Sequence, residues 1–288
     1  MTVNRRTFLA TGAAGLLSGC VSFPLFGKKL RLAVQTYVLR DLLKKDLSGT
    51  YARIRELGLE GVELWNTPAF DPKTIRRLLD DNGLEVCGAH LSHDMLSPDK
   101  IERTLDYANE VGNRNLIVAW MQPSKDEKDV VGWWKREADF YSRAAVTAAA
   151  RGCRVGYHNH YHEFTQRFEG KTLWEIFMTR ISKDVIIQLD VGSAVHVDED
   201  PVYWYTRFPG RSPSVHLRDE WDREKGFPGV VGEPPPGRKG VDWPALFAAM
   251  RADPVTEWAV LEPVTSDTFD TVAKSIDNLR AMGLVSCR

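Results

Sequence analysis

The chain of 288 residues lacks several features that mark common functional classes. It has only four cysteines, and no spacing among them resembles a metal knuckle or a redox pair, so we assign the thiols no function. No glycine-rich phosphate fingerprint follows an apolar run, which argues against a dinucleotide-binding fold. The formal net charge of -1 offers no basic surface for nucleic acid. What remains is an ordinary globular composition, with 43% hydrophobic and 27% charged residues.

The N-terminal twenty residues differ from the rest and predict an export signal. Asn4-Arg5-Arg6-Thr7-Phe8-Leu9 has the form of a twin-arginine signal, and the apolar stretch that follows is too short to span a bilayer. Leu17-Ser18-Gly19-Cys20 then predicts a lipoprotein cleavage box, with lipidation of Cys20. In the alternative, an ordinary signal is cleaved and Cys20 is incidental. We therefore expect a protein of the periplasm or cell envelope that meets the membrane only through an N-terminal lipid anchor.

From Leu30 onward one unit repeats: an amphipathic helix, a glycine, and an apolar strand two or three residues later. The glycines predict left-handed caps that end each helix, as in Val111-Gly112, and Asp71-Pro72 and Ser97-Pro98 predict helix starts. The expected strands are 31–36, 61–65, 85–90, 115–119, 154–160, 185–190, 213–217 and 257–262, and the expected helices are 48–57, 72–82, 98–111, 127–151, 171–181, 199–207, 242–252 and 267–282. Eight such units predict that residues 29–288 form a single α/β domain, a (β/α)8 TIM barrel, after the signal segment 1–20.

Four of the expected strands end in side chains that bind metals well. These are His158, Asp190, His216 and Glu262, from four consecutive strands of the second half. The carboxyl ends of barrel strands meet at one mouth, where burying unpaired imidazoles and carboxylates is costly. A divalent cation such as Mn, Zn, Co or Mg removes that cost, so the sequence predicts a metal site there.

The same strand-end rule selects further candidates. Glu63 and His90 are expected to bind substrate, although a single strand-end residue of this type is often a hydrogen-bonded structural group. His160 is expected to point the same way as His158, because side chains alternate along a strand, and Glu163 follows in the loop. Arg218 stays charged, so we assign it a binding role rather than that of a base.

The connection after His216 is unusually long and contains Gly226-Phe227-Pro228-Gly229 and a second turn-rich stretch from Gly232 to Gly237. Long connections in compact domains are typically binding loops or lids. A stiff, inert proline-rich excursion is the alternative.

Several of these phrases resemble strand-end motifs of the xylose-isomerase-like barrel superfamily of sugar phosphate isomerases and epimerases, which also contains an endonuclease branch. They are Gly61-Val62-Glu63-Leu64, Tyr157-His158-Asn159-His160, Glu163-Phe164, Leu189-Asp190-Val191-Gly192, His216-Leu217-Arg218-Asp219 and Val260-Leu261-Glu262. The resemblance implies a divalent metal held by residues of the fifth to eighth strands, and it carries over directly to Asp190, His216 and Glu262. Epimerases of the superfamily have a Glu where this chain has His158. The His-Asn-His pattern is similar to an exported branch, some of whose members act on 3-keto sugars by elimination or hydration.

The sequence therefore predicts a metal-dependent enzyme that abstracts a proton next to the carbonyl of a keto sugar or glycoside. Glu262, His158 or His160 is the expected base, and Glu163 is a further catalytic candidate. The reaction is an isomerisation or epimerisation, or alternatively an elimination or hydration of a 3-keto glycoside. Two other hypotheses are a sugar-binding lipoprotein without catalysis and a nucleic-acid enzyme; the near-neutral charge argues against the latter.

Overall fold

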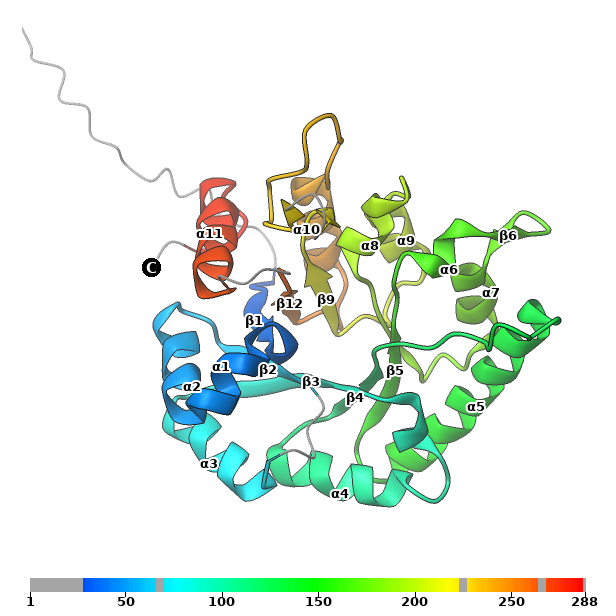
Figure 1. Ribbon diagram of the computed structural model, residues 1–288, viewed down its shortest axis with the longest axis horizontal. Helices are drawn as coiled ribbons and strands as arrows, with labels where there is room; N and C mark the ends of the chain where they lie inside the picture. Colours follow the sequence, from blue (N-terminus) through cyan, green and yellow to red (C-terminus); the bar gives the residue numbers. More distant parts are fainter. Residues whose placement is uncertain (1–27, 66–69, 223–226, 264–267, 287–288) are drawn as a thin grey trace, which may run out of the picture.

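The computed structural model describes residues 28–65, 70–222, 227–263 and 268–286 (Figure 1). The predicted signal segment, including Cys20, lies outside the described residues, so export and lipidation stay predictions. Within the described parts of the chain, no helix combines the length and the apolar character needed to cross a membrane.

Eight parallel strands form one sheet that curves into a barrel with the helices outside it (Figure 1). The strands are β1 (Arg31–Gln35), β2 (Gly61–Trp65), β3 (Glu85–Leu91), β4 (Asn115–Val118), β5 (Arg154–His158), β8 (Ile186–Gln188), β9 (Ser214–Leu217) and β12 (Trp258–Leu261). Their order is β8-β5-β4-β3-β2-β1-β12-β9. The predicted single (β/α)8 barrel is confirmed, with every expected strand present.

The barrel closes between β8 and β9 by only a few backbone contacts. An isolated parallel bridge joins Asp190 to His216, and the His216 N–H donates to the Leu189 carbonyl at 2.9 Å. The Ile187 N–H donates to the Arg211 carbonyl at the same distance. This seam therefore runs directly through two of the predicted metal ligands.

The strands are continuous apolar runs because both of their faces are covered, as expected for parallel strands. All four residues of β4 and of β9 are buried, for example. Cys87 and Cys153 are buried free thiols within this framework.

The eight long helices also agree with prediction to within a few residues at their ends. They are α2 (Leu47–Glu56), α3 (Pro72–Asp81), α4 (Ile101–Val111), α5 (Val130–Ala150), α7 (Leu173–Arg180), α9 (Pro201–Arg207), α10 (Trp243–Ala252) and α11 (Thr268–Ala281). The Asp71 carboxylate caps α3 by accepting from the Thr74 N–H, and Gly112 ends α4 with a φ of 78°. The predicted start at Ser97-Pro98 is wrong, because Ser97 Oγ bonds to Asp94 and Asp99 and α4 begins only at Ile101.

Several short elements were not predicted, since they are too short to show a period. They are the 3-10 turns η1 (Thr36–Leu39) and η3 (His93–Leu96), helices α1 (Arg40–Lys45), α6 (His162–Thr165) and α8 (Val191–His196), and the hairpins β6 (Arg167–Phe168) with β7 (Lys171–Thr172) and β10 (Trp221–Asp222) with β11 (Phe227–Pro228). Two of them shorten the predicted strands. The chain turns into α6 after His158, and Asp190 caps α8 instead of extending β8.

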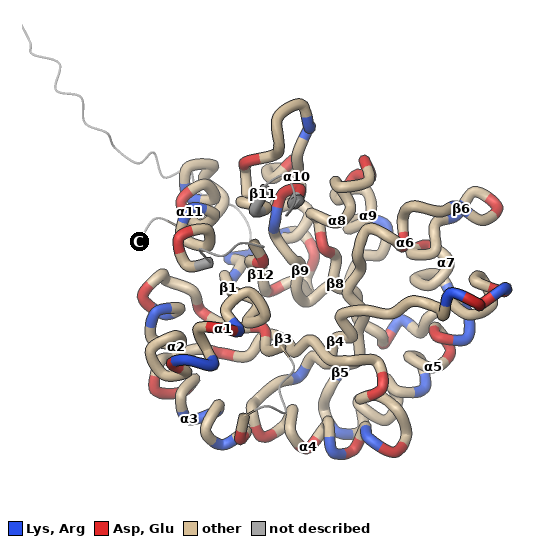
Figure 2. Tube along the Cα trace, in the orientation of Figure 1, with Lys and Arg blue, Asp and Glu red and all other residues tan. Residues whose placement is uncertain are grey.

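The outer helices carry charges of both signs, with Lys and Arg interspersed among Asp and Glu along α3, α4 and α5 (Figure 2). This distribution matches the near-zero net charge.

Candidate metal-binding active site

The mouth of the barrel, defined by the C-terminal ends of its strands, collects a set of buried polar side chains. They are Gln35 (β1), Glu63 (β2), His90 (β3), His158 (β5), Gln188 (β8) and His216 (β9), with Asp190, Arg218 and Glu262 just beyond strand ends. Each of these residues is at most 8% exposed. Because buried polar groups are stable only with partners, their contacts define what the site can do.

The four predicted metal ligands lie together. Donor atoms of His158, Asp190 and Glu262 are within 4.8 Å of one another, and His216 Nδ1 is 3.2 Å from Glu262 Oε2. His158 Nε2 lies 3.7 Å from Asp190 Oδ2. A second buried group, formed by His90, His158 and His216, meets the same 4.8 Å limit.

Arg218, predicted to bind substrate, lies inside this group. Its Nε donates to Asp190 Oδ1 at 3.1 Å, its Nη2 donates to Asp190 Oδ2, and its Nη1 lies 3.4 Å from Glu262 Oε2. The Asp190 carboxylate also accepts from the Ser193 N–H at 3.0 Å. The guanidinium therefore supplies positive charge between two carboxylates that are expected to hold a cation.

Glu63 and His90, the other predicted substrate-binding residues, lie deeper. Glu63 is 0% exposed, and its Oε2 accepts from Gln35 Nε2 and His216 Nε2, both at 2.6 Å. His90 Nε2 is 3.0 Å from the same oxygen. Glu63 therefore lies beneath the imidazoles, and its Oε2 is engaged by side chains of the protein itself.

Gln188 was missed by sequence reasoning although it is central to the site. Its Nε2 donates to Glu63 Oε1 at 2.5 Å and to Ser214 Oγ at 2.7 Å. Its Oε1 lies 2.7 Å from His90 Nε2 and 3.0 Å from His158 Nδ1. The sequence did contain one sign of this role. Gln188 stands two residues before Asp190, so both side chains lie on one face of the expected strand 185–190.

The charges in the site are strongly coupled. Burial opposes a charged ring at His216, but Glu63 and Glu262 outweigh it and raise the pKa of His216 to about 10. Burial, together with His216 and His90, holds the pKa of His158 well below its ordinary value. Burial disfavours the ionised form of Glu262, yet Arg218 and His216 reverse this effect and lower its pKa. At neutral pH the site thus contains a neutral imidazole beside charged partners.

His160 is brought to the site as predicted. Its ring centroid lies 5.0 Å from that of His158 and 4.5 Å from that of Trp120, which meets it edge-on. Burial lowers the pKa of His160 to about 3, so the ring is neutral. Its Nδ1 has no hydrogen-bond partner among the residues that the structure describes.

Glu163 is not brought into the group. Its Oε1 accepts from the Tyr157 hydroxyl, and its Oε2 accepts from the His160 N–H at 2.9 Å. Burial raises the pKa of Glu163 to about 8, against the opposing effect of the Tyr157 hydrogen bond. Its contacts orient the loop that carries His160.

Aromatic side chains remain exposed around the mouth. Trp65, Trp120 and Tyr161 are 38%, 43% and 39% exposed and stand at or just beyond the ends of β2, β4 and β5. Trp65 meets Tyr37 with ring centroids 4.9 Å apart. Exposed indole and phenol rings around a polar centre suit a ligand with both C–H faces and hydroxyl groups.

The donor set fits a divalent cation. Imidazole and carboxylate are the mixed nitrogen and oxygen ligands that first-row divalent ions accept, and His158, Asp190 and Glu262 bring three such buried donors within 4.8 Å of one another. His158, Asp190 and Glu262 would hold the ion, and His216 would join them through Nδ1 once the cation displaces its proton. Gln188, in contact with His90 and His158, would orient those two rings.

The long connection after β9 is anchored by Asp219, which is 0% exposed. Its Oδ2 accepts from the Gly232 N–H at 2.7 Å and from Trp243 Nε1 at 3.1 Å, and its Oδ1 accepts from the Val241 N–H at 3.3 Å. Part of the segment that predicted a binding loop, including Gly226, lies outside the described residues. A lid function for this loop stays a prediction.

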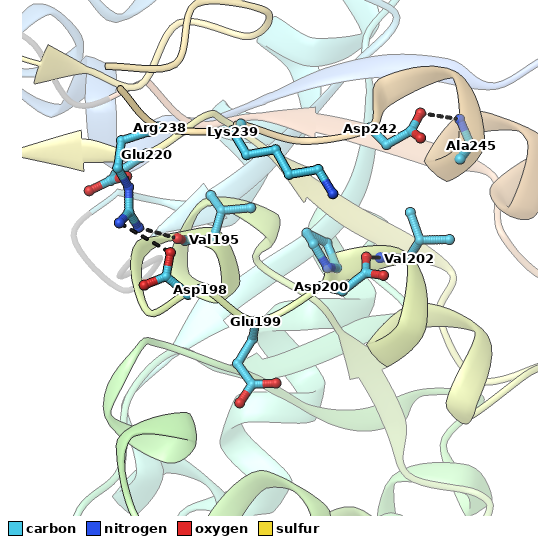
Figure 3. Close-up of a pocket in the computed structure, with 12 residues that line it drawn as sticks. Val195, Asp198, Glu199, Asp200, Val202, Glu220, Arg238, Lys239, Asp242 and Ala245 are labelled. Carbon is cyan, nitrogen blue, oxygen red and sulfur yellow. Dashed lines mark hydrogen bonds and ion pairs between the residues drawn. The ribbon is translucent and has the colours of Figure 1, made fainter. Parts of the chain in front are cut away.

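Beside this connection lies a separate cavity of about 300 Å³, between the turn after α8 and the chain before α10 (Figure 3). Its acidic residues already have partners. Asp200 and Asp242 accept from the Val202 and Ala245 N–H groups, while Glu220 and Asp198 pair with Arg238. The cavity is therefore not the predicted active site, and its carboxylates serve the local fold.

These features define the class of the protein. A model of the xylose isomerase-like TIM barrel family matches residues 51–282, so the chain belongs to that family.

Individual relatives are distant. The inosose dehydratase of Lacticaseibacillus casei is 24% identical over 254 residues, which cover 76% of this chain and 83% of that protein. A sugar phosphate isomerase/epimerase from Parabacteroides distasonis ATCC 8503 has a similar structure, with a TM-score of 0.74 and 20% identity over 89% of this chain and 100% of that one. D-psicose 3-epimerase from Clostridium cellulolyticum H10 gives a TM-score of 0.65 and 16% identity over 90% and 100%. At such identities the structural likeness shows the fold alone.

Proposed function

We propose that the chain is a divalent-metal-dependent enzyme that removes the proton next to the carbonyl of a keto sugar or sugar derivative. The observation that carries this proposal is the buried group of His158, Asp190 and Glu262 at the barrel mouth, with His216 against Glu262. A divalent cation bound by these residues would supply Lewis-acid polarisation of the substrate carbonyl.

His160 is the base that the contacts favour. Glu262 is held by His216 and Arg218, and the two ring nitrogens of His158 face Gln188 and Asp190. His160 carries a neutral ring whose buried Nδ1 has no hydrogen-bond partner within the described residues, so a substrate would reach it once the side chains that cover it move. It lies against Trp120 at the mouth, where a substrate would enter.

A single free base supports elimination over epimerisation. Epimerisation by paired groups needs an acid and a base on opposite faces of the substrate, and His158 replaces the glutamate that would supply one of them. In elimination, His160 takes the proton from the carbon next to the carbonyl, and the C–H electron pair forms a C=C bond. The C–O bond at the next carbon then breaks, and His160 returns the proton to the departing oxygen, so that water or an alcohol leaves.

A sugar or glycoside is the substrate class that the mouth supports. Trp65, Trp120 and Tyr161 expose aromatic faces on which the C–H groups of a sugar ring can pack. Arg218 lies at the same centre, where its guanidinium pairs with Asp190 and Glu262.

Metal content of the purified protein tests the proposal, measured beside Asp190→Ala and His216→Ala. We expect about one divalent ion per chain in the wild type and loss of the ion in both variants. His93→Ala is the matched control, since His93 pairs with Glu137 and belongs to neither buried group of candidate ligands among the described residues. A metal-free wild type after reconstitution with Mn, Zn, Co and Mg would refute the metal-dependent mechanism and favour a sugar-binding protein.

Product analysis separates the two reaction types. Turnover of keto sugars and 3-keto glycosides in D₂O should give an unsaturated product with loss of water or alcohol. A product isomeric with its substrate and labelled with deuterium at the reacting carbon would show isomerisation or epimerisation instead.

A further inference from the structure

We propose that Gln188 is a positioning residue that fixes the tautomer of His158, so that the Nε2 lone pair of that ring faces the predicted metal site. The consequence for metal binding rests on the function proposed above. The tautomer of His158 itself follows from the contacts of Gln188 alone.

The orientation of the Gln188 amide follows from Glu63. The Glu63 carboxylate accepts from Gln35 Nε2 and from His216 Nε2, which marks it as an acceptor for all its neighbours. Its other oxygen is 2.5 Å from Gln188, so the Gln188 atom there must be the Nε2 donor. A reversed amide would place two acceptor oxygens against each other.

With the amide in this orientation, its oxygen faces two imidazoles. Gln188 Oε1 lies 2.7 Å from His90 Nε2 and 3.0 Å from His158 Nδ1. An amide oxygen has lone pairs and no proton, so each of these ring nitrogens must carry the hydrogen. A neutral imidazole carries only one, which leaves His158 Nε2 as the acceptor 3.7 Å from Asp190 Oδ2.

The backbone holds this arrangement in place. Gln188 is the last residue of β8 and is paired in register with His158, the last residue of β5. Ser214 Oγ, at the start of β9, accepts from the same Nε2 at 2.7 Å. The amide of β8 thus contacts side chains of four other strands, β2, β3, β5 and β9.

An amide suits this position better than the carboxylate that often orients metal-binding histidines. A glutamate there would face Glu63 with no proton to donate, whereas glutamine donates to Glu63 and accepts from the rings. Gln188 therefore orients His158 without adding a further negative charge below the site.

The test uses ring ¹⁵N NMR of the full chain and calorimetric titration with Zn²⁺. In the wild type, His158, assigned by the loss of its signal in His158→Asn, should carry its proton on Nδ1. In Gln188→Met this single tautomer should be lost, and Zn²⁺ affinity should fall about 10- to 100-fold, as for other residues that orient metal ligands.

Gln35→Met is the matched control. Gln35 is a buried glutamine that also donates to Glu63, but its recorded contacts do not include His158. This variant should keep the Nδ1–H tautomer of His158. Circular dichroism shows whether each variant folds. If Gln188→Met does not fold, the ¹⁵N NMR spectrum of the wild type still shows which ring nitrogen of His158 carries the proton.

A wild-type His158 with its proton on Nε2 would overturn the inference, and so would a folded Gln188→Met with unchanged tautomer and Zn²⁺ affinity. Failure of the wild type to bind any metal is a different result, because it contradicts the proposed function while the tautomer measurement still tests Gln188.

Discussion

At the scale of single side chains, the mouth contains two kinds of polar residue. Glu63 and Gln188 have close partners on every side, and they hold the imidazoles above them. His160 has an unpartnered ring nitrogen within the described structure and stands beside an exposed tryptophan. This division separates residues that hold the imidazoles in place from one whose buried ring nitrogen is left without a partner.

The Trp120 side chain should contribute to substrate binding rather than to the chemical step. Trp120→Ala should raise KM about 2- to 10-fold with little change in kcat, since an aromatic contact contributes about 0.5–1.5 kcal/mol. Steady-state kinetics measures both constants. Tyr203→Ala, at an exposed aromatic of α9, is the control and should leave KM unchanged. A fall in kcat alone would contradict this role for Trp120.

Glu163 should make stability depend on pH. Its pKa is raised from 4.5 to about 8 in the folded protein, so between these values the folded state keeps a proton that the unfolded state releases. This contribution to stability is fully present below about pH 4.5 and is lost as the pH rises through 8. Replacing the residue in Glu163→Gln should remove it.

Urea unfolding at a series of pH values measures this effect. From pH 5 to 8, the free energy of unfolding of the wild type should fall relative to that of Glu163→Gln. Glu102→Gln, at an exposed residue of α4 that pairs with Arg151, serves as the control. Parallel curves for the wild type and Glu163→Gln would show that Glu163 is not protonated in the folded state.

The sequence could predict a site residue when the chemical type of its side chain is unusual for its position. His158, Asp190, His216 and Glu262 stand out because imidazole and carboxylate are rare at the ends of buried strands, and the structure brings them together. Gln188 has no such distinctive chemistry, and its role depends on which strands are neighbours around the closed barrel. That information is absent from any local pattern.

At the scale of helices and strands, the length of an element determined whether the sequence could predict it. The long helices and all the barrel strands show a period or an apolar run, whereas α6 and α8 cover about one turn each. Both short helices follow site strands and set the ends of β5 and β8. The elements missed by the sequence are therefore the ones that determine where His160 and Asp190 lie.

The connection from β9 to α10 should depend on Asp219. Asp219→Ala leaves the buried indole N–H of Trp243 without its acceptor, which should cost about 1–3 kcal/mol, and it also removes the acceptor of the part-buried Gly232 and Val241 N–H groups. Urea unfolding measures the loss. Asp242→Ala removes only the cap of α10 and should cost about 1 kcal/mol. Equal losses in the two variants would show that Asp219 does not anchor the connection.

At the scale of the whole molecule, a bound metal should stabilise the barrel. At a free concentration 100 times its dissociation constant, a ligand that binds only the folded state adds about 2.7 kcal/mol. Thermal unfolding should therefore show a higher Tm with saturating metal and a lower one after chelation. Asp190→Ala should show no such difference, and a metal-dependent Tm in this variant would place the ion elsewhere.

The export prediction concerns residues outside the described structure. If Arg5 and Arg6 form a twin-arginine signal, their joint replacement by lysine should retain the protein in the cytoplasm. Cys20→Ser should release it from the membrane fraction. Cell fractionation measures both effects, and an unchanged distribution would contradict an exported lipoprotein.

The closure between β8 and β9 has a consequence for the dynamics of the barrel. Few backbone hydrogen bonds join these strands, so local opening there breaks less structure than opening at any seam with a longer ladder. Amide hydrogen exchange of Ile187 and His216, whose N–H groups donate across this seam, should accordingly be faster than that of β1 and β12. Such breathing would separate Asp190 from His216 and so loosen the proposed metal site.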